Sequence, residues 1–118
     1  MTDVLYIDCC IRGEQSRTKR LGEAFLSALV RAGGYEIERL TLMDEPLQPL
    51  ANGFFWQRER LIEAGALDHA RFRYAWRFKR AERIVIAAPF WDLSFPALLK
   101  IYIENLCVQG ITFDCDEH

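Results

Sequence analysis

Two short, continuous apolar runs constrain the fold of this 118-residue chain more than any other feature. They are Val4-Leu5-Tyr6-Ile7 and Ile84-Val85-Ile86-Ala87, and neither alternates with polar residues. A strand with one wet face would alternate, whereas a strand of a parallel sheet is covered by helices on both faces. The runs therefore predict two doubly covered parallel strands, and the length predicts one domain over residues 1–118.

The segment between the runs predicts a helix and an edge strand. A helix is expected over residues 17–32, with an apolar stripe on one side and Gly33-Gly34 as the C-cap. The stripe consists of Leu21, Phe25, Ala28 and Leu29. Residues 36–42 then alternate charged and apolar side chains, which favours a half-exposed strand at the border of the sheet.

Residues 44–80 form the less regular part of the pattern. Two prolines within residues 44–50 predict an extended connection. Residues 53–80 predict two helices broken near Gly65, and their larger aromatic residues are candidates for either core or interface. These are Trp56, Phe72, Trp76 and Phe78. Strands and helices thus alternate along the chain, which favours parallel pairing through right-handed crossovers.

The loop after the second apolar run, residues 87–97, is a candidate binding segment. Pro89 ends the strand, Ser94 is a candidate N-cap for the next helix, and Pro96 supplies an early helical φ. Between them stand Phe90 and Trp91. Open α/β sheets bind ligands at the carboxyl ends of such strands.

The first loop, residues 9–18, is a candidate anion site. It follows Asp8 at the end of the first strand and leads into the first predicted helix. Ser16, Arg17 and Thr18 would bring hydroxyl groups, a cation and unpaired amides to the helix N-terminus, which favours a phosphate. The simpler alternative is that Ser16 only caps the helix.

Two other site classes fit the residues poorly. Small phosphatases and arsenate reductases have a Cys, then five residues, then an Arg followed by Ser or Thr. Counting from Cys10, the Arg position is Ser16, and Arg17 comes one place late. Counting from Cys9 misses by two. The tail 114–118 contains Cys and His, yet adjacent residues at a chain end cannot surround a metal ion without distant partners.

Residues 87–97 and their continuation resemble a known family. Leu98-Leu99-Lys100-Ile101-Tyr102-Ile103 and the later Gly110-Ile111-Thr112-Phe113 extend the match to the flavin-contacting loop of the flavodoxin-like NAD(P)H:quinone oxidoreductases and FMN-dependent azoreductases. Ser16-Arg17-Thr18 fits the Ser-x-Ser/Thr pattern by which that family holds the FMN phosphate. Cys10 stands where the family often has a Ser near that phosphate.

The resemblance implies a fold and a site. The fold is a three-layer flavodoxin-like parallel α/β sheet of order 2-1-3, continuing to strands 4 and 5. FMN would bind at the switch point between strands 1 and 3, and hydride would pass from NAD(P)H through the flavin to a quinone or an azo compound. The cofactor contacts would be Cys10, Ser16, Arg17, Thr18, Pro89, Phe90, Trp91, Asp92 and Leu93.

No catalytic side chain is expected, because the cofactor carries the chemistry. The two histidines, His69 and His118, are expected to be solvated. Asp92 replaces an Asn common in the family, and its charge near the ring should lower the flavin potential.

Strands 4 and 5 are missing or incomplete in the sequence, since residues 111–113 are too short to form a strand. The second apolar run would be left as an open edge, which predicts either a longer natural protein, the favoured reading, or a partner chain. The family's glycine-rich loop over the flavin is also not found. The alternative function is a non-catalytic flavodoxin-like interaction domain, dimeric through the helix beginning at Ala97 and through Trp56 and Trp76.

The composition of the chain limits its possible cellular location and binding partners. A net charge of -2 with Arg and Glu intermixed argues against nucleic-acid binding. No membrane segment or signal peptide is recognisable, so a cytoplasmic protein is expected. The family resemblance implies a small-molecule electron acceptor and a homodimeric assembly. The four cysteines are expected to be reduced thiols, namely Cys9, Cys10, Cys107 and Cys115.

Overall fold

The computed structural model describes residues 3–114, which form a three-stranded parallel sheet of order β2-β1-β3. The strands are β1 (Val4–Asp8), β2 (Ile37–Thr41) and β3 (Arg83–Ala87). In register, Val4 lies opposite Ile37 and Arg83, and Asp8 lies opposite Thr41 and Ala87. The parallel pairing and the 2-1-3 order are as predicted, with β2 at the border.

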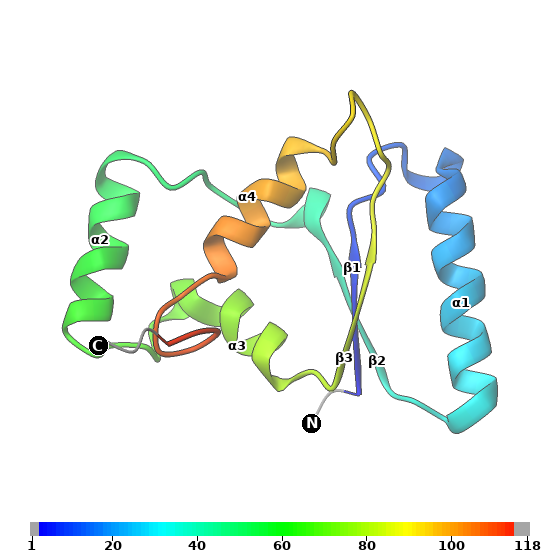
Figure 1. The fold of residues 1–118 in the computed structure, drawn as a ribbon, viewed down its shortest axis with the longest axis horizontal. Helices are drawn as coiled ribbons and strands as arrows, with labels where there is room; N and C mark the ends of the chain where they lie inside the picture. Colours follow the sequence, from blue (N-terminus) through cyan, green and yellow to red (C-terminus); the bar gives the residue numbers. More distant parts are fainter. Residues whose placement is uncertain (1–2, 115–118) are drawn as a thin grey trace.

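Helices cover both faces of the sheet (Figure 1). On one face lies α1 (Arg17–Gly33); on the other lie α3 (Arg73–Arg80) and α4 (Ala97–Leu106). The remaining helix, α2 (Asn52–Glu63), stands farther from the sheet, beyond α3 and α4. Short 3-10 turns occur at Gly13–Gln15, Leu42–Asp44 and Ala70–Phe72.

The central strand explains why the first apolar run does not alternate. All five residues of β1 are buried. Leu5 and Ile7 pack in the core shared with α3 and α4, whereas Val4 and Tyr6 pack in the core shared with α1. Because successive side chains of a strand point to opposite faces, a strand between two helical layers needs apolar residues at every position.

The first helix is held close to the sheet by a glycine. A Cβ atom at Gly22 would lie 2.6 Å from the Tyr6 hydroxyl oxygen and 3.2 Å from two of its ring carbons. That hydroxyl is buried and has no hydrogen-bond partner among the described residues. The helix ends where expected, with Gly34 in the left-handed conformation at φ 64°. Gly22 therefore sets the distance between α1 and β1.

The outer side of β3 is open, as predicted. No strand among residues 3–114 pairs with it, and the segment around Thr112 forms only a single bridge, between Gln109 and Phe113. Ile86 of β3 is 47% exposed, and Leu21 of α1 is 74% exposed. With Phe25 they line an apolar groove of about 360 Å³ between α1 and β3.

The aromatic residues of the second half divide between core and surface. A left-handed Gly65, at φ 71°, separates α2 from the next helical segment, as predicted. Phe72 is buried, and the Trp76 indole N–H donates to a backbone carbonyl at 2.7 Å. Trp56 is 60% exposed on α2. Trp56 therefore remains available to a partner, whereas Trp76 is engaged within its own chain.

Part of the predicted tail lies outside the described residues. Cys115, Asp116, Glu117 and His118 belong there, so the candidate metal site and the second histidine have no structural account. Within residues 3–114 no helix has the length and apolar character needed to cross a bilayer.

Candidate functional site

The two loops singled out in the sequence lie side by side at the carboxyl ends of adjacent strands. The Cys9 amide donates to the Ala87 carbonyl at 2.8 Å, which extends the β1–β3 ladder one residue beyond the strands. Both loops emerge at the same end of the sheet (Figure 1). This is the position between strands 1 and 3 at which ligands bind in doubly wound sheets.

A cleft of about 240 Å³ separates the two loops. Its lining residues are Arg12, Ser16, Arg17, Thr18, Pro89, Phe90 and Trp91. Six of the nine cofactor-contact candidates are thus brought together. Cys10, Asp92 and Leu93 do not line the cleft, and Arg12 was missed by the sequence argument. As a cation in the turn before α1, Arg12 could have been found from its position.

The first wall of the cleft is suited to an anion. Ser16 is the N-cap of α1, and its Oγ accepts a hydrogen bond from the Lys19 amide at 3.1 Å. The amides of Arg17 and Thr18 belong to the first turn, where the helix supplies no carbonyl partner. Neither Arg12 nor Arg17 forms an ion pair with any residue from 3 to 114. Two cations and the positive helix end therefore face the same cleft.

Cys10 is turned away from the cleft. Its Sγ lies 3.5 Å from the Ala87 carbonyl oxygen and donates to it, and its amide donates to the Asp8 carboxylate at 2.9 Å. Burial, with a smaller contribution from Asp8, raises the pKa of the Cys10 thiol to about 11. A neutral, buried thiol is not the thiolate nucleophile that a phosphatase requires.

The second wall continues as a tight hairpin. The amides and carbonyls of Trp91 and Ser94 exchange hydrogen bonds at 2.6 and 2.7 Å. The two residues between them, Asp92 and Leu93, have φ values of 51° and 64°. Two consecutive left-handed residues match a type I′ turn, for which Asn, Asp and Gly are preferred. Leu93 is 90% exposed and is not a residue that favours this conformation.

The prediction that Ser94 is the N-cap of the last helix is wrong. α4 begins at Ala97, and its N-cap is Pro96, which offers no side-chain hydrogen bond. Ser94 is committed to the hairpin through both its amide and its carbonyl. Pro96 has ψ 146° and so lies just before the helix, not within its first turn.

Replacing Leu93 by Gly should stabilise the protein by roughly 0.5–1 kcal/mol, because relief of the left-handed strain exceeds the entropy cost of glycine. The matched control is Leu21→Gly, which replaces another exposed leucine, this time inside α1. The control should destabilise by about 1 kcal/mol. Urea unfolding midpoints measure both. A loss of stability in Leu93→Gly would contradict the strained turn.

The second wall of the cleft is aromatic and open to solvent. Phe90, Trp91 and Phe95 are all exposed, and the rings of Phe90 and Phe95 meet edge to face at 5.8 Å. The site thus joins a cationic, donor-lined end to an exposed aromatic surface. It suits a ligand with a phosphate at one end and a flat apolar ring at the other.

His69 lies outside this site. Its Nδ1 accepts a hydrogen bond from the Arg71 amide at 3.1 Å, at the start of the 3-10 turn Ala70–Phe72. It is exposed and does not line the cleft. Among residues 3–114, therefore, no histidine lines the cleft.

Comparisons with known proteins agree with this arrangement. A family model described as flavodoxin-like fold matches residues 2–118. The FMN-dependent NADH:quinone oxidoreductase 2 of Clostridium acetobutylicum is 38% identical over 99% of this chain and 59% of its own length. The FMN-dependent NADH:quinone oxidoreductase of Coprothermobacter proteolyticus is 34% identical over the whole chain and 60% of its own length.

Solved structures also match nearly the whole chain. The azoreductase of Bacillus anthracis superposes with a TM-score of 0.82 at 28% identity, covering 97% of this chain and 59% of that one. The chain therefore spans about three fifths of the length of the curated relatives that it matches.

Proposed function

Because the chain belongs to the flavodoxin-like fold family, we propose that it binds FMN and takes part in NAD(P)H-dependent reduction of quinones or azo compounds. The observation that carries the proposal is the cleft between the β1 and β3 loops, which joins an anion-binding helix end to an aromatic wall. The relatives named as FMN-dependent NADH:quinone oxidoreductases support it.

The residues of the cleft fit FMN by their chemistry. Ser16 and Thr18 offer hydroxyl groups, and Arg12 and Arg17 offer unpaired cations to a phosphate. Phe90 and Trp91 offer ring surface. Asp92 and Leu93 stand at the tip of the hairpin, beside the proposed ring position. We assign Cys10 no direct contact, because its thiol is directed at Ala87 and only adjoins Ser16.

FMN, when bound, supplies a ring that accepts hydride from a nicotinamide and passes electrons to the acceptor. The protein's part is to bind and orient. The cleft holds no His, Asp or Glu among its lining residues, so no acid–base pair is assigned there. Its volume is below the roughly 300–1,000 Å³ of most cofactor pockets, so the cleft between the two loops would enclose only part of FMN and leave the ring open on its outer face.

Reconstitution with FMN tests the proposal directly. The purified protein is incubated with FMN and dialysed, and retained flavin absorbance is measured. NADH and NADPH oxidation is then followed with a quinone and with an azo dye as acceptors. We expect saturable FMN binding and acceptor-dependent oxidation. A protein that retains no FMN would contradict the proposal.

The second candidate is a non-catalytic interaction domain. The open side of β3 and the apolar groove beside it favour this function, since uncovered sheet edges and apolar grooves pair with other chains. Failure to take up FMN together with stable self-association in sedimentation would support it over the reductase.

We propose a homodimer and a cytoplasmic location as parts of the same function. Trp56 on α2 and Ile103 on α4 are both exposed and could contact a second copy. Cys107 is an exposed free thiol, which suits a reducing compartment. Sedimentation equilibrium tests the dimer, and fractionation of cells tests the location.

Asp92→Asn should raise the flavin reduction potential by about 20 mV, because it removes a negative charge close to a ring that becomes anionic on reduction. Potentiometric titration of the FMN-loaded protein measures the change. Glu82→Gln is the matched control, since Glu82 precedes β3 at the opposite end of the strand. An unchanged potential in Asp92→Asn would show that the carboxylate does not act on the ring.

A further inference from the structure

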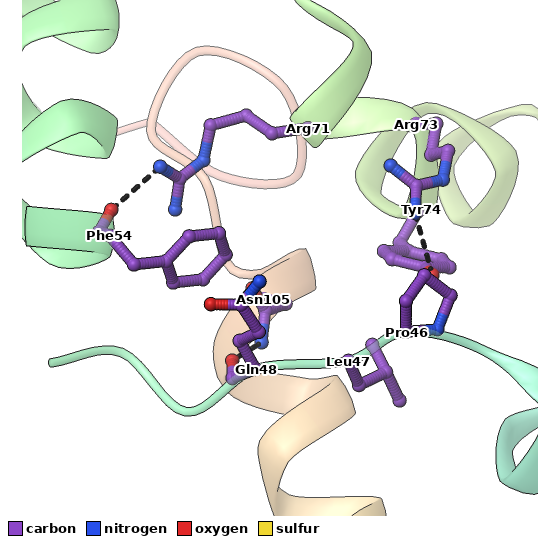
Figure 2. Close-up of a pocket in the computed structure, with 8 residues that line it drawn as sticks. All are labelled: Pro46, Leu47, Gln48, Phe54, Arg71, Arg73, Tyr74 and Asn105. Carbon is purple, nitrogen blue, oxygen red and sulfur yellow. Dashed lines mark hydrogen bonds between the residues drawn. The ribbon is translucent and has the colours of Figure 1, made fainter.

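A second cavity lies on the α3–α4 side of the sheet, away from the proposed FMN cleft. It has a volume of about 190 Å³ and shares no lining residue with that cleft. Figure 2 shows it between the segment that follows β2 and the starts of α2 and α3, with α4 below. Its lining residues are Pro46, Leu47, Gln48, Phe54, Arg71, Arg73, Tyr74 and Asn105.

Arg71 is the unusual residue of this cavity. Its guanidinium lies 3.8 Å from the centre of the Phe54 ring, and Nη1 donates to the Phe54 carbonyl at 2.6 Å and to Gln57 Oε1 at 2.8 Å. Nη2 is buried and has no hydrogen-bond partner among the described residues. Burial, with repulsion from Arg58, lowers the pKa of Arg71.

The charge of Arg71 is not balanced locally. No Asp or Glu lines the cavity, and Arg71 forms no ion pair with residues 3–114. Arg73 adds a second cation, with Nη2 donating to the Tyr74 hydroxyl at 3.0 Å. That hydroxyl donates in turn to the Glu45 carboxylate at 2.9 Å.

Two cations that line one cavity with no carboxylate in its wall attract an anion. We propose that this cavity binds a small oxyanion, a carboxylate or a phosphate group, between the guanidinium groups of Arg71 and Arg73, which both line it. Guanidinium groups are the preferred partners of both oxyanions.

The size of the cavity limits the ligand. An apolar cavity of about 150 Å³ admits benzene. A cavity of 190 Å³ therefore admits inorganic phosphate or a short carboxylate, but not a nucleotide. Pro46, Leu47 and Phe54 would contact the apolar part of a carboxylate. Asn105 donates to the Gln48 and Ile101 carbonyls, which fixes the wall opposite Arg71.

Nuclear magnetic resonance titration of the full chain tests the proposal. Inorganic phosphate and acetate are added separately at constant ionic strength, while the Arg71 Nε–Hε and Asn105 side-chain amide signals are followed. Because these signals come from the second cavity, phosphate binding beside Arg17 does not confuse the result. Saturable shifts with phosphate alone would identify a phosphate site, and shifts with acetate alone a carboxylate site. Shifts with both would identify a general oxyanion site.

Three variants locate the binding. Arg71→Gln should weaken it roughly tenfold or more, and Arg71→Lys, which keeps the charge without the planar donor fork, should weaken it less. Arg80→Gln is the matched control, because Arg80 is an exposed arginine at the end of α3 and lies outside the cavity. Arg71→Lys preserves the test if Arg71→Gln does not fold. Absence of a saturable shift with either anion, or equal loss in Arg80→Gln and Arg71→Lys, would overturn the proposal.

Discussion

Arg17→Glu is expected to weaken FMN binding by about a hundredfold, equivalent to about 3 kcal/mol. The substitution removes an unpaired guanidinium from the cleft and places a carboxylate at the helix end that would hold the phosphate. A charge-assisted hydrogen bond to phosphate is worth roughly 1.5–3 kcal/mol, and repulsion adds to its loss. Fluorescence quenching of FMN on titration with protein measures the affinity.

Two comparisons make that result specific. Arg20→Glu carries the same charge change on the next turn of α1, outside the cleft, and should alter FMN affinity only slightly. Riboflavin, which lacks the phosphate, should bind Arg17→Glu and the parent protein almost equally. Equal losses for FMN and riboflavin would mean that Arg17 does not contact the phosphate.

Gly22→Ala should destabilise the fold by about 1–3 kcal/mol, although alanine normally stabilises a helix interior. The added Cβ would lie 2.6 Å from the buried Tyr6 hydroxyl. The Tyr6 side chain projects from β1 into the core beneath α1 and cannot easily move. Gly53→Ala is the matched control, since no atom lies within 4 Å of a Cβ there. It should stabilise by roughly 0.5–1 kcal/mol.

Tyr6→Phe separates the two causes of this destabilisation. The hydroxyl that it removes has no hydrogen-bond partner among the described residues, so the single substitution should be neutral or slightly stabilising. In the double variant with Gly22→Ala, part of the lost stability should return, because the shortest contact is gone. Urea unfolding of the four proteins gives the coupling energy. If the changes in unfolding free energy of the two single variants simply add up in the double variant, the contact with the hydroxyl is not the cause, and α1 shifts as a whole to accommodate the added Cβ.

The parts of the fold set by apolar periodicity were predictable from the sequence. The uninterrupted run in β1 required cover on both faces, and Gly34 ended α1 where its left-handed preference indicated. The cleft was also predictable in outline, because parallel strands carry their following loops to one end of the sheet. Whether the site residues bind FMN remains a prediction.

Local loop geometry was not predictable in the same way. Ser94 has the chemistry of an N-cap, but the hairpin with Trp91 uses its backbone, and that pairing depends on two left-handed residues, one of them Leu93. Arg71 resembles any surface arginine in the sequence. Its burial against Phe54 depends on how α2 packs near α3, which no short pattern encodes.

The hydrogen bond from the Cys9 amide to the Ala87 carbonyl has a kinetic consequence. It ties the bases of the two loops together, so the cleft cannot widen there without breaking the sheet ladder. Entry and exit of a ligand must then depend on movement of the hairpin around Asp92 and Leu93, a motion expected in roughly nanoseconds to microseconds. The rate of ligand release should therefore respond to substitutions in that turn more than to any in β1 or β3.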